Sequence, residues 1–369
     1  MSRPPFTPII EALPPLVPFI GPEAMERARG RAFQARLGAN ENVFGPSLHA
    51  LAIMREAVNG NWMYSDPENY ELRSAISKFH CVSIDNVVVG EGIDGLLGLT
   101  CQLFIVPGDR VVMTQGSYPT FNFHVLAHGG KVVGCPMLDF KEDLQGMAQV
   151  ARDTRAKLIY VSNPNSPMGT CWTGAELARW ISDLPKGVLL ILDEAYCDTA
   201  PVGISPIMDT SNAQVVHYRT FSKAYGMAGA RIGYAIAHVD LIAAFDKVRN
   251  HYGINRIGQL GARAALEDQS YLSSVVQKID RARIRISQIA TDHGLRTVAS
   301  AASFVAIDCG HDGEFAKRVL DGLILRDVFA RKPSVPPLDR FIRVSCGRDE
   351  DLDVFEKALS AALADARSR

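Results

Sequence analysis

The chain contains 369 residues, 47% of them hydrophobic, and its 39 basic and 40 acidic side chains give a formal net charge of −1. This length favours one large domain with a smaller one, and the near-neutral charge argues against a nucleic acid or an anionic membrane as the partner. Chemistry on a small molecule is the class of function that remains.

The seven cysteines are scattered, odd in number and without a C-x-x-C pair, so we expect reduced thiols and neither a disulfide framework nor a zinc knuckle. His124 and His128 have the spacing of two ligands on one helical face, but no cluster of carboxylates or cysteines accompanies them, and we expect no metal. No apolar run reaches the length of a membrane span, and the proline-rich N-terminus lacks the cleavage site of a secretory signal. These features predict a cytoplasmic protein.

In chain order, the first expected unit is the proline-rich segment 1–40, which should pack on the smaller domain. The large domain is expected at 41–258, and from residue 87 onward its short β-branched runs alternate with helical or turn segments. Most of these runs are continuously apolar, which is typical of strands covered on both faces in a parallel sheet. The expected strands are residues 87–89, 110–113, 131–135, 157–162, 188–195, 214–221 and 231–237.

The last of these strands should run antiparallel to the strand before it. Only seven residues separate Lys223 from Arg231, whereas a parallel crossover requires about a dozen or more. Helices should cover both faces of the sheet. We therefore predict an α/β fold whose large domain has a seven-stranded, mostly parallel sheet.

The pattern changes to helix after Asn255, and Gly294 ends the longest helical stretch. Separated strands and a final helix follow, which suits a smaller α+β domain at 259–369. The elements expected in this part are helices at 259–266, 271–293 and 350–363 and strands at 303–308 and 341–346.

Polar motifs follow three of the expected strands at their carboxyl ends, where open α/β sheets bind ligands. Segment 163–169 reads Asn-Pro-Asn-Ser-Pro-Met-Gly, Asp193 and Tyr196 end the next strand, and Ser222 and Lys223 end the one after. Packing alone explains such a group poorly, because each buried polar side chain would need its own partner. A lysine among them is chemically useful when its charge is consumed, as in a Schiff base to an aldehyde cofactor.

A glycine turn follows the first strand, with Gly90, Gly92 and Gly95 in the G-x-G-x-x-G spacing. This spacing matches the dinucleotide fingerprint, but backbone N–H groups at a helix N-terminus serve the phosphate of a mononucleotide-like cofactor equally well. The candidate ribose-binding acid, Asp109, stands in a turn before a strand. We interpret the turn as a phosphate cup and keep an NAD-dependent oxidoreductase as an alternative.

Further motifs complete a series along the chain. Its members are Asn40–Ser47, Tyr64–Pro67, the glycine turn, Tyr118–Phe121, segment 163–169, Asp193–Tyr196, segment 219–231 and Phe341–Val344. In order and spacing they resemble the fold-type I enzymes that depend on pyridoxal 5′-phosphate, and among these the histidinol-phosphate aminotransferase-like branch of the class I and II aminotransferases. The resemblance covers nearly the whole chain. It implies an aspartate-aminotransferase-like fold, pyridoxal phosphate as cofactor, and a homodimer with shared active sites.

The resemblance also implies roles for three residues of the central motifs. Lys223 resembles the Schiff-base lysine, whose amine then moves a proton between the substrate Cα and the cofactor. Asp193 resembles the carboxylate that keeps the pyridine nitrogen protonated. Tyr196 resembles the hydroxyl that hydrogen-bonds the phenolic oxygen of the cofactor.

Other cofactor contacts follow from the same resemblance. Phe121 falls where an aromatic ring stacks on the cofactor. Either Asn165 or Ser166 should contact a cofactor oxygen, because the asparagine of the family motif is shifted by one position here. The expected phosphate ligands are Ser222, Arg231, the backbone around Gly92, Ile93 and Asp94, and Tyr64 from a second subunit.

The substrate contacts are expected at Arg343, which resembles the arginine that clamps a carboxylate, and at Arg331, which resembles one that binds a side-chain phosphate. Asn40 and Phe19 belong to the segments expected to line the pocket. Phe19 replaces a tyrosine that helps to receive the substrate phosphate in related enzymes. Histidinol phosphate and an aromatic or other L-amino acid are both open as amino donors.

The function implied by the resemblance is transfer of an amino group between an L-amino acid or related amine and a 2-oxo acid. A decarboxylase, lyase or cyclase with the same cofactor is the nearest alternative, because sequence motifs do not separate these reactions.

Overall fold

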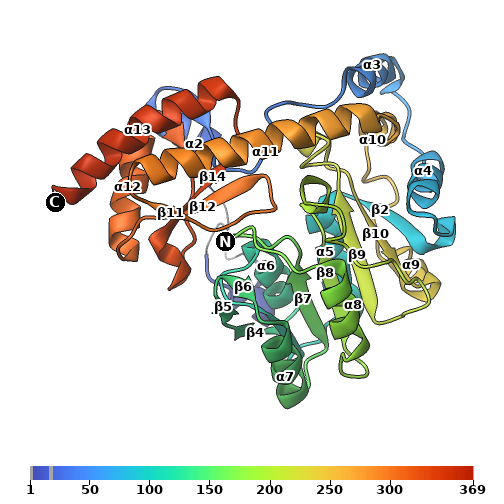
Figure 1. Cartoon of the computed structure of the whole chain (residues 1–369). Coiled ribbons are helices and arrows are strands. Elements are labelled where there is room, and N and C mark those ends of the chain that lie inside the picture. Colours follow the sequence, from blue (N-terminus) through green and yellow to red (C-terminus); the bar gives the residue numbers. More distant parts are fainter. Residues whose placement is uncertain (1–2, 16–19, 369) are drawn as a thin grey trace.

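The computed structural model describes residues 3–15 and 20–368, which form two lobes joined by one long helix (Figure 1). This helix, α11 (Gln269–Asp292), begins beside α10 (Arg256–Glu267) in the larger lobe and ends beside α13 (Asp349–Arg367) in the smaller one. The carboxylate of Asp268 caps α11 by accepting a hydrogen bond from the backbone N of Tyr271 at 3.1 Å. No helix within the described ranges has the length and apolarity needed to cross a membrane.

The larger lobe is built on a seven-stranded, mostly parallel sheet, which confirms the sequence prediction. Strand β10 is antiparallel to both of its neighbours, as the short connection after Lys223 predicts, and the other neighbouring pairs are parallel. In spatial order the strands are β2 (Val87–Gly90), β10 (Gly233–Ala237), β9 (Val215–Thr220), β8 (Leu189–Asp193), β7 (Leu158–Ser162), β3 (Arg110–Thr114) and β4 (Lys131–Cys135).

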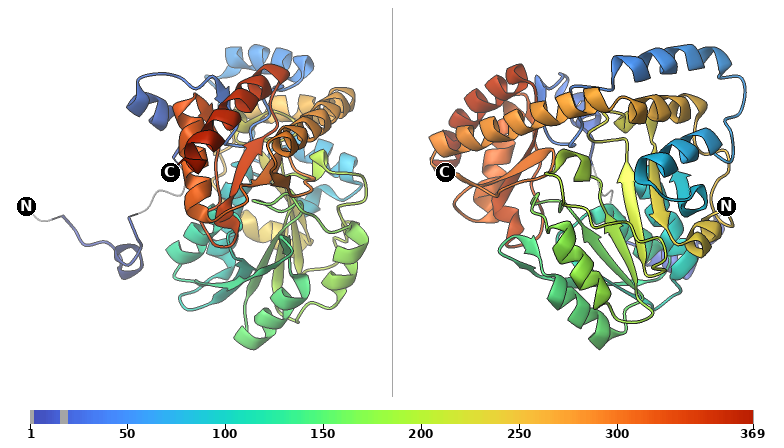
Figure 2. Two further views of the ribbon diagram at one scale, coloured as in Figure 1. Left: turned by 60° about the vertical axis from the view of Figure 1, so that its left-hand side comes forward. Right: turned by 45° about the vertical axis from the view of Figure 1, so that its right-hand side comes forward.

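Helices cover both faces of this sheet (Figure 2). Alternate residues of a strand point to opposite faces. On β7, Tyr160 therefore enters the core formed with α5 and α6, whereas Ile159 enters the core formed with α7 and α8. The helices of this lobe, besides α10, are α3 (Leu48–Ala57), α4 (Tyr70–His80), α5 (Gly92–Phe104), α6 (Pro119–Ala127), α7 (Leu144–Thr154), α8 (Gly174–Ser182) and α9 (Val239–Phe245).

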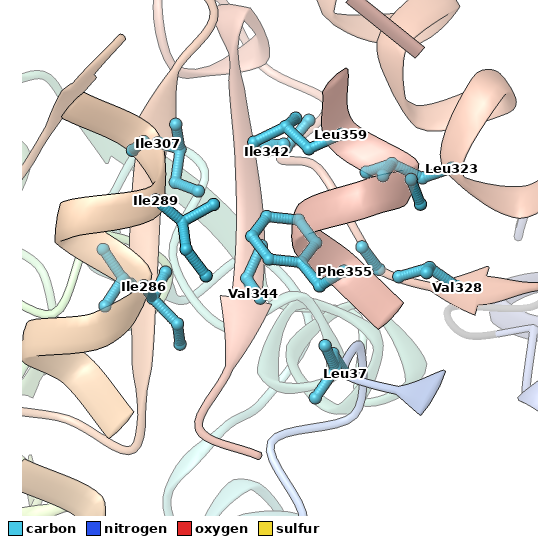
Figure 3. Close-up of a cluster of buried hydrophobic side chains, with 14 of the residues drawn as sticks. Leu37, Ile286, Ile289, Ile307, Leu323, Val328, Ile342, Val344, Phe355 and Leu359 are labelled. Carbon is cyan, nitrogen blue, oxygen red and sulfur yellow. The ribbon is translucent and has the colours of Figure 1, made fainter. Parts of the chain in front are cut away.

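The smaller lobe packs α11, α12 (Gly313–Leu325) and α13 against an antiparallel sheet of β11 (Arg296–Thr297), β12 (Phe304–Asp308) and β14 (Phe341–Ser345). Figure 3 shows Ile342 and Val344 of β14 pointing toward Phe355 and Leu359 of α13. Because successive strand residues face opposite sides, Arg343 and Ser345 are left on the other face of β14.

The N-terminal segment contacts both lobes. Strand β1 (Ala35–Arg36) pairs in parallel with β13 (Val328–Phe329) of the smaller lobe. An ion pair between Arg29 and Asp327 joins α2 (Pro22–Arg29) to the residue just before β13. In contrast, α1 (Pro8–Glu11) contacts α6 of the larger lobe. A small hairpin of β5 (Met137–Leu138) and β6 (Lys141–Glu142) follows β4.

The cores suggest where the two domains meet. Ala262 and Leu266 of α10 share a core with Ala50 and Leu72 of the larger lobe, whereas Val275 of α11 belongs to the core of the smaller lobe. We therefore propose that the domain boundary lies between α10 and α11, somewhat later than residue 258.

Candidate active site

The turn after β9 carries Lys223 to the carboxyl edge of the sheet. Lys223 is half-buried, and its Nζ lies 3.4 Å from the backbone oxygen of Asn40 and 5.4 Å from the centroid of the Tyr196 ring. Gly226 follows with φ of 69°, and a Cβ there would lie 2.3 Å from the backbone of Gly45. The turn is thus held against the segment after Asn40, and the structure brings Lys223 and Tyr196 together.

Asp193 ends β8 beside this turn and is buried. Its Oδ1 accepts a hydrogen bond from the backbone N of Ala195 at 2.9 Å, and its Oδ2 accepts one from the hydroxyl of Tyr160 at 2.6 Å. Burial raises the pKa of Asp193, while these two hydrogen bonds and the charge of Lys223 act in the opposite direction. A buried carboxylate in this position favours a cationic partner.

An ion-pair network behind the strand ends holds β8 to β9. The carboxylate of Glu194 accepts hydrogen bonds from Arg219 Nε at 3.1 Å and from Ser205, and it lies 3.2 Å from His217 Nδ1. Arg219 also lies 3.5 Å from Asp198. Burial alone would raise the pKa of Glu194, but Arg219 and His217 lower it to about 2. The network therefore contains a permanent charge pair directly beside Asp193.

The N-terminus of α5 forms a cup for an anion. The Glu91 side chain, at the N-cap, makes no capping hydrogen bond among the described residues. Arg231 closes the cup, since a Cβ on Gly92 would lie 2.5 Å from its Nη2, and its Nη1 lies 3.4 Å from the hydroxyl of Ser222. A Cβ on Gly233 would lie 2.7 Å from the backbone N of Ile93, so only glycine fits there. A guanidinium, a hydroxyl and a helix N-terminus suit a phosphate.

The two candidates in segment 163–169 face different surroundings. Asn165 is buried, and its Nδ2 donates to Glu142 Oε1 at 3.0 Å. Burial raises the pKa of Glu142 to about 8, against the effect of its hydrogen bonds. Ser166 is half-buried, and its hydroxyl lies 3.5 Å from Arg343 Nη1. Ser166 is therefore the residue of the two that lies beside another expected site residue.

The expected stacking residue Phe121 is completely buried, and its ring packs on Tyr160 with centroids 4.9 Å apart. The half-buried Tyr118, at the N-cap of α6, was not expected in the site. Burial, followed by the nearby charges of Asp94 and Asp193, raises the pKa of its hydroxyl. Tyr118 is thus better placed than Phe121 to cover a ligand between these two carboxylates.

Arg343 and Arg331 lie side by side on the smaller lobe. Arg343 N donates to the backbone oxygen of Arg331 at 2.6 Å, and their charges oppose each other. Burial lowers the pKa of both guanidinium groups. The Arg343 guanidinium lies 3.5 Å from the Ser166 hydroxyl, 3.4 Å from the Gly38 oxygen and 5.2 Å from the centroid of the Phe304 ring. No carboxylate of the described residues forms an ion pair with it. Two half-buried cations side by side, of which Arg343 lies near Tyr196, favour an anionic ligand group.

Two expected residues lie outside this cluster. Tyr64 is highly exposed, with its ring 4.8 Å from that of Tyr252. It therefore presents its hydroxyl at the protein surface. Phe19 lies outside the described residues.

Comparisons with known proteins agree with this geometry. The family model of aminotransferases of class I and II matches residues 34–359. A histidinol-phosphate aminotransferase of Moorella thermoacetica is 31% identical over 96% of this chain and 92% of its own length. The crystal structure of histidinol-phosphate aminotransferase from Sinorhizobium meliloti, in complex with pyridoxal-5′-phosphate, is 44% identical, with a TM-score of 0.96 and 99% of each chain covered. A double mutant of Thermus thermophilus aspartate aminotransferase has the same fold, with a TM-score of 0.77. It is 23% identical, and the match covers 97% of this chain and 100% of the mutant's chain.

Proposed function

The chain belongs to the class I and II aminotransferases and is a pyridoxal-phosphate-dependent transaminase, and from this premise we propose that it exchanges an amino group between histidinol phosphate and a 2-oxo acid. The observation that carries the choice of substrate is the pair of adjacent, half-buried arginines, Arg331 and Arg343, of which Arg343 lies near Tyr196. A phosphorylated amine supplies the anion that such a pair favours, and the relatives that bear this substrate in their names match the chain over nearly its whole length.

The residues of the site fit pyridoxal phosphate. The cup at the start of α5, with Arg231 and Ser222, suits its phosphate, and the buried Asp193 suits a protonated ring nitrogen. Tyr196 would face the phenolic oxygen, and Tyr118 would cover the ring in the role first expected of Phe121. Ser166 rather than Asn165 would reach the cofactor side of the segment. When bound, the cofactor withdraws electrons and so stabilises negative charge at the substrate Cα.

The protein groups perform the rest of the reaction. Lys223 Nζ would take the proton from the substrate Cα as a positioned general base. It would then donate this proton to the cofactor as a general acid. Asp193 would stay ionised opposite the ring nitrogen, with Tyr160 and Ala195 holding both carboxylate oxygens in place. Arg343 would orient the substrate by its anionic group, so that the Cα proton faces the lysine.

Replacing Tyr160 with phenylalanine is expected to weaken cofactor binding roughly tenfold, since loss of one hydrogen bond makes the carboxylate of Asp193 harder to keep ionised. Titration of the apoenzyme with pyridoxal phosphate measures this affinity. Tyr218→Phe is the matched control, because Tyr218 is an equally buried tyrosine on β9, two strands away, whose hydroxyl contacts Thr100. Equal losses in both variants would contradict a specific effect through Asp193.

We also propose a homodimer in the cytoplasm, with Tyr64 completing the phosphate site of the second subunit. The exposure of Tyr64 and of its neighbour Trp62, at 82% and 83%, supports this assembly, because large apolar side chains in a group favour a covered surface. The free state of all seven cysteines supports a reducing compartment.

A spectroscopic half-reaction tests the substrate. Holoenzyme mixed with histidinol phosphate, without a 2-oxo acid, should convert the visible band of lysine-bound cofactor to that of the pyridoxamine form. This conversion is expected to be at least roughly tenfold faster than with L-phenylalanine at equal concentration, and Arg331→Gln should remove most of the difference.

An aromatic L-amino acid is the second candidate, because Phe19 lacks the hydroxyl that the tyrosine of related enzymes offers to a phosphate. Faster conversion by L-phenylalanine would favour it over histidinol phosphate. Release of carbon dioxide or ammonia without formation of the pyridoxamine form would contradict transamination itself.

A further inference from the structure

Asn40 joins three elements at the site. Its Nδ2 donates to the hydroxyl oxygen of Tyr196 at 2.9 Å, and its backbone oxygen accepts from Lys223 Nζ at 3.4 Å. Its Oδ1 accepts from the hydroxyl of Ser345 at 2.9 Å. Asn40 is buried, with φ of 55°, a left-handed conformation that asparagine tolerates better than most residues. One residue thus links the catalytic lysine, through its backbone oxygen, and the tyrosine, through its side chain, to a strand of the small lobe.

Ser345 occupies the face of β14 that also carries Arg343. The neighbouring residues Ile342 and Val344 point into the core of the smaller lobe, which leaves this face toward the site (Figure 3). The backbone N of Ser345 donates to the oxygen of Leu37 at 2.8 Å, so β14 also holds the segment that leads to Asn40. Ser345 is 2% exposed, and its hydroxyl is therefore directed at protein partners.

The hydrogen bonds of Ser345 determine the orientation of the Asn40 amide. The Ser345 oxygen accepts from the backbone N of Asn40 at 2.9 Å, and its single proton is donated to Asn40 Oδ1. The amide NH2 group must then face Tyr196. If the amide were rotated by half a turn, the proton of Ser345 would lose this acceptor, and Oδ1 would take the hydroxyl proton of Tyr196 instead.

We propose that Ser345 is a positioning residue which, by fixing the amide of Asn40, keeps the hydroxyl proton of Tyr196 free to bind the phenolic oxygen of pyridoxal phosphate. This inference depends on the proposed function, in which Tyr196 faces that oxygen. Ser345 does not touch the cofactor. Its effect passes through two hydrogen bonds, from Ser345 to Asn40 and from Asn40 to Tyr196. Since Arg343 is on the same face of β14, one strand both orients the substrate and sets the donor at Tyr196.

The pH titration of the visible cofactor band tests this proposal in purified holoenzyme. A hydroxyl that donates to the phenolic oxygen draws negative charge from it, so loss of this donor should let the adjacent lysine linkage hold its proton to higher pH. Ser345→Ala is expected to raise the midpoint of this pH titration by roughly 0.5 to 1 pH unit. Tyr196→Phe should move it at least as far, and Ser345→Ala added to Tyr196→Phe should cause no further shift.

Two variants separate this effect from a general loss of packing. Ser303→Ala is the matched control, because Ser303 is a buried serine just before β12 whose hydroxyl has no hydrogen-bond partner among the described residues. It should leave the midpoint unchanged. Ser345→Thr keeps the hydroxyl and should retain a midpoint close to that of the wild type.

A midpoint in Ser345→Ala equal to that of the wild type would overturn the proposal. An equal shift in Ser303→Ala, or the same shift in Ser345→Thr as in Ser345→Ala, would also overturn it, because the change would then not depend on the hydroxyl. A wild-type protein that binds pyridoxal phosphate without any lysine-linked band would contradict the proposed function, and this inference with it. The wild-type spectrum therefore distinguishes the two failures.

Discussion

A Lys223→Ala enzyme is expected to retain less than about one ten-thousandth of the wild-type kcat, because the same Nζ both links the cofactor and moves the substrate proton. Lys223 has the position for both tasks, with its Nζ beside Tyr196 and near the buried Asp193. The variant should still bind pyridoxal phosphate through the cup at α5, but without the visible band that borohydride reduction removes. Steady-state kinetics and absorption spectra measure the two effects separately.

Lys157→Ala is the control for this prediction. Lys157 is also half-buried, but it pairs with Asp109 just before β7, at the end of the strand opposite the site. Its loss should leave both the spectrum and kcat close to the wild type. A borohydride-reducible band that persists in Lys223→Ala, on another lysine identified by peptide mass, would show that the lysine assignment is wrong.

Arg219→Met is expected to lower the free energy of unfolding by about 3–5 kcal/mol, because it leaves the charge of Glu194 buried without its main partner. The side chains of Arg219 and Glu194 are only 10% and 1% exposed. Thermal unfolding of the holoenzyme should shift downward by several degrees. Arg263→Met is the matched control, since Arg263 pairs with Glu267 on the surface of α10, where such a pair contributes at most about 1 kcal/mol.

The pH dependence of this effect has a definite sign. The pKa of Glu194 is lowered to about 2 in the folded protein, so the contribution of the pair is complete above the unfolded pKa of about 4.3 and is lost as the pH falls toward 2. The gap in stability between wild type and Arg219→Met should therefore narrow as the pH falls through this range. Adding Glu194→Gln to Arg219→Met should recover much of the loss at pH 7. A gap that is unchanged by pH would contradict an electrostatic origin.

Much of the fold and the central chemistry could be predicted from sequence because the signals are local. Continuous apolar runs identify buried parallel strands, and the short connection between Lys223 and Arg231 determines that β10 is antiparallel. Asp193, Tyr196 and Lys223 each follow such a strand, so their placement at one edge of the sheet follows from the strand order.

The contacts that could not be predicted depend on the relative depth and rotation of distant segments. Phe121 and Tyr118 lie three positions apart, and only the docking of α6 on the sheet decides that Phe121 is buried on Tyr160. The side chain of Asn165 donates a hydrogen bond to Glu142 of the β5–β6 hairpin. The sequence of this hairpin carries no signal for that contact. Ser345 is distinguished from an ordinary strand serine only by the segment that β14 happens to hold. Alternation along β7 and β14 could have identified the faces of Tyr160 and Ser345, but not their partners.

The place of β2 in the sheet affects the order in which the protein can be assembled during synthesis. This strand lies at the sheet edge and pairs with β10, which is made long after it. At about 5–20 residues per second, roughly seven to thirty seconds separate the two strands on the ribosome. During this time β2 has no neighbouring strand, and α5 has no Arg231 to complete its anion cup. The larger lobe therefore cannot capture its cofactor from its N-terminal half alone, and a nascent chain that stops before Gly233 exposes an unpaired apolar strand edge to other chains.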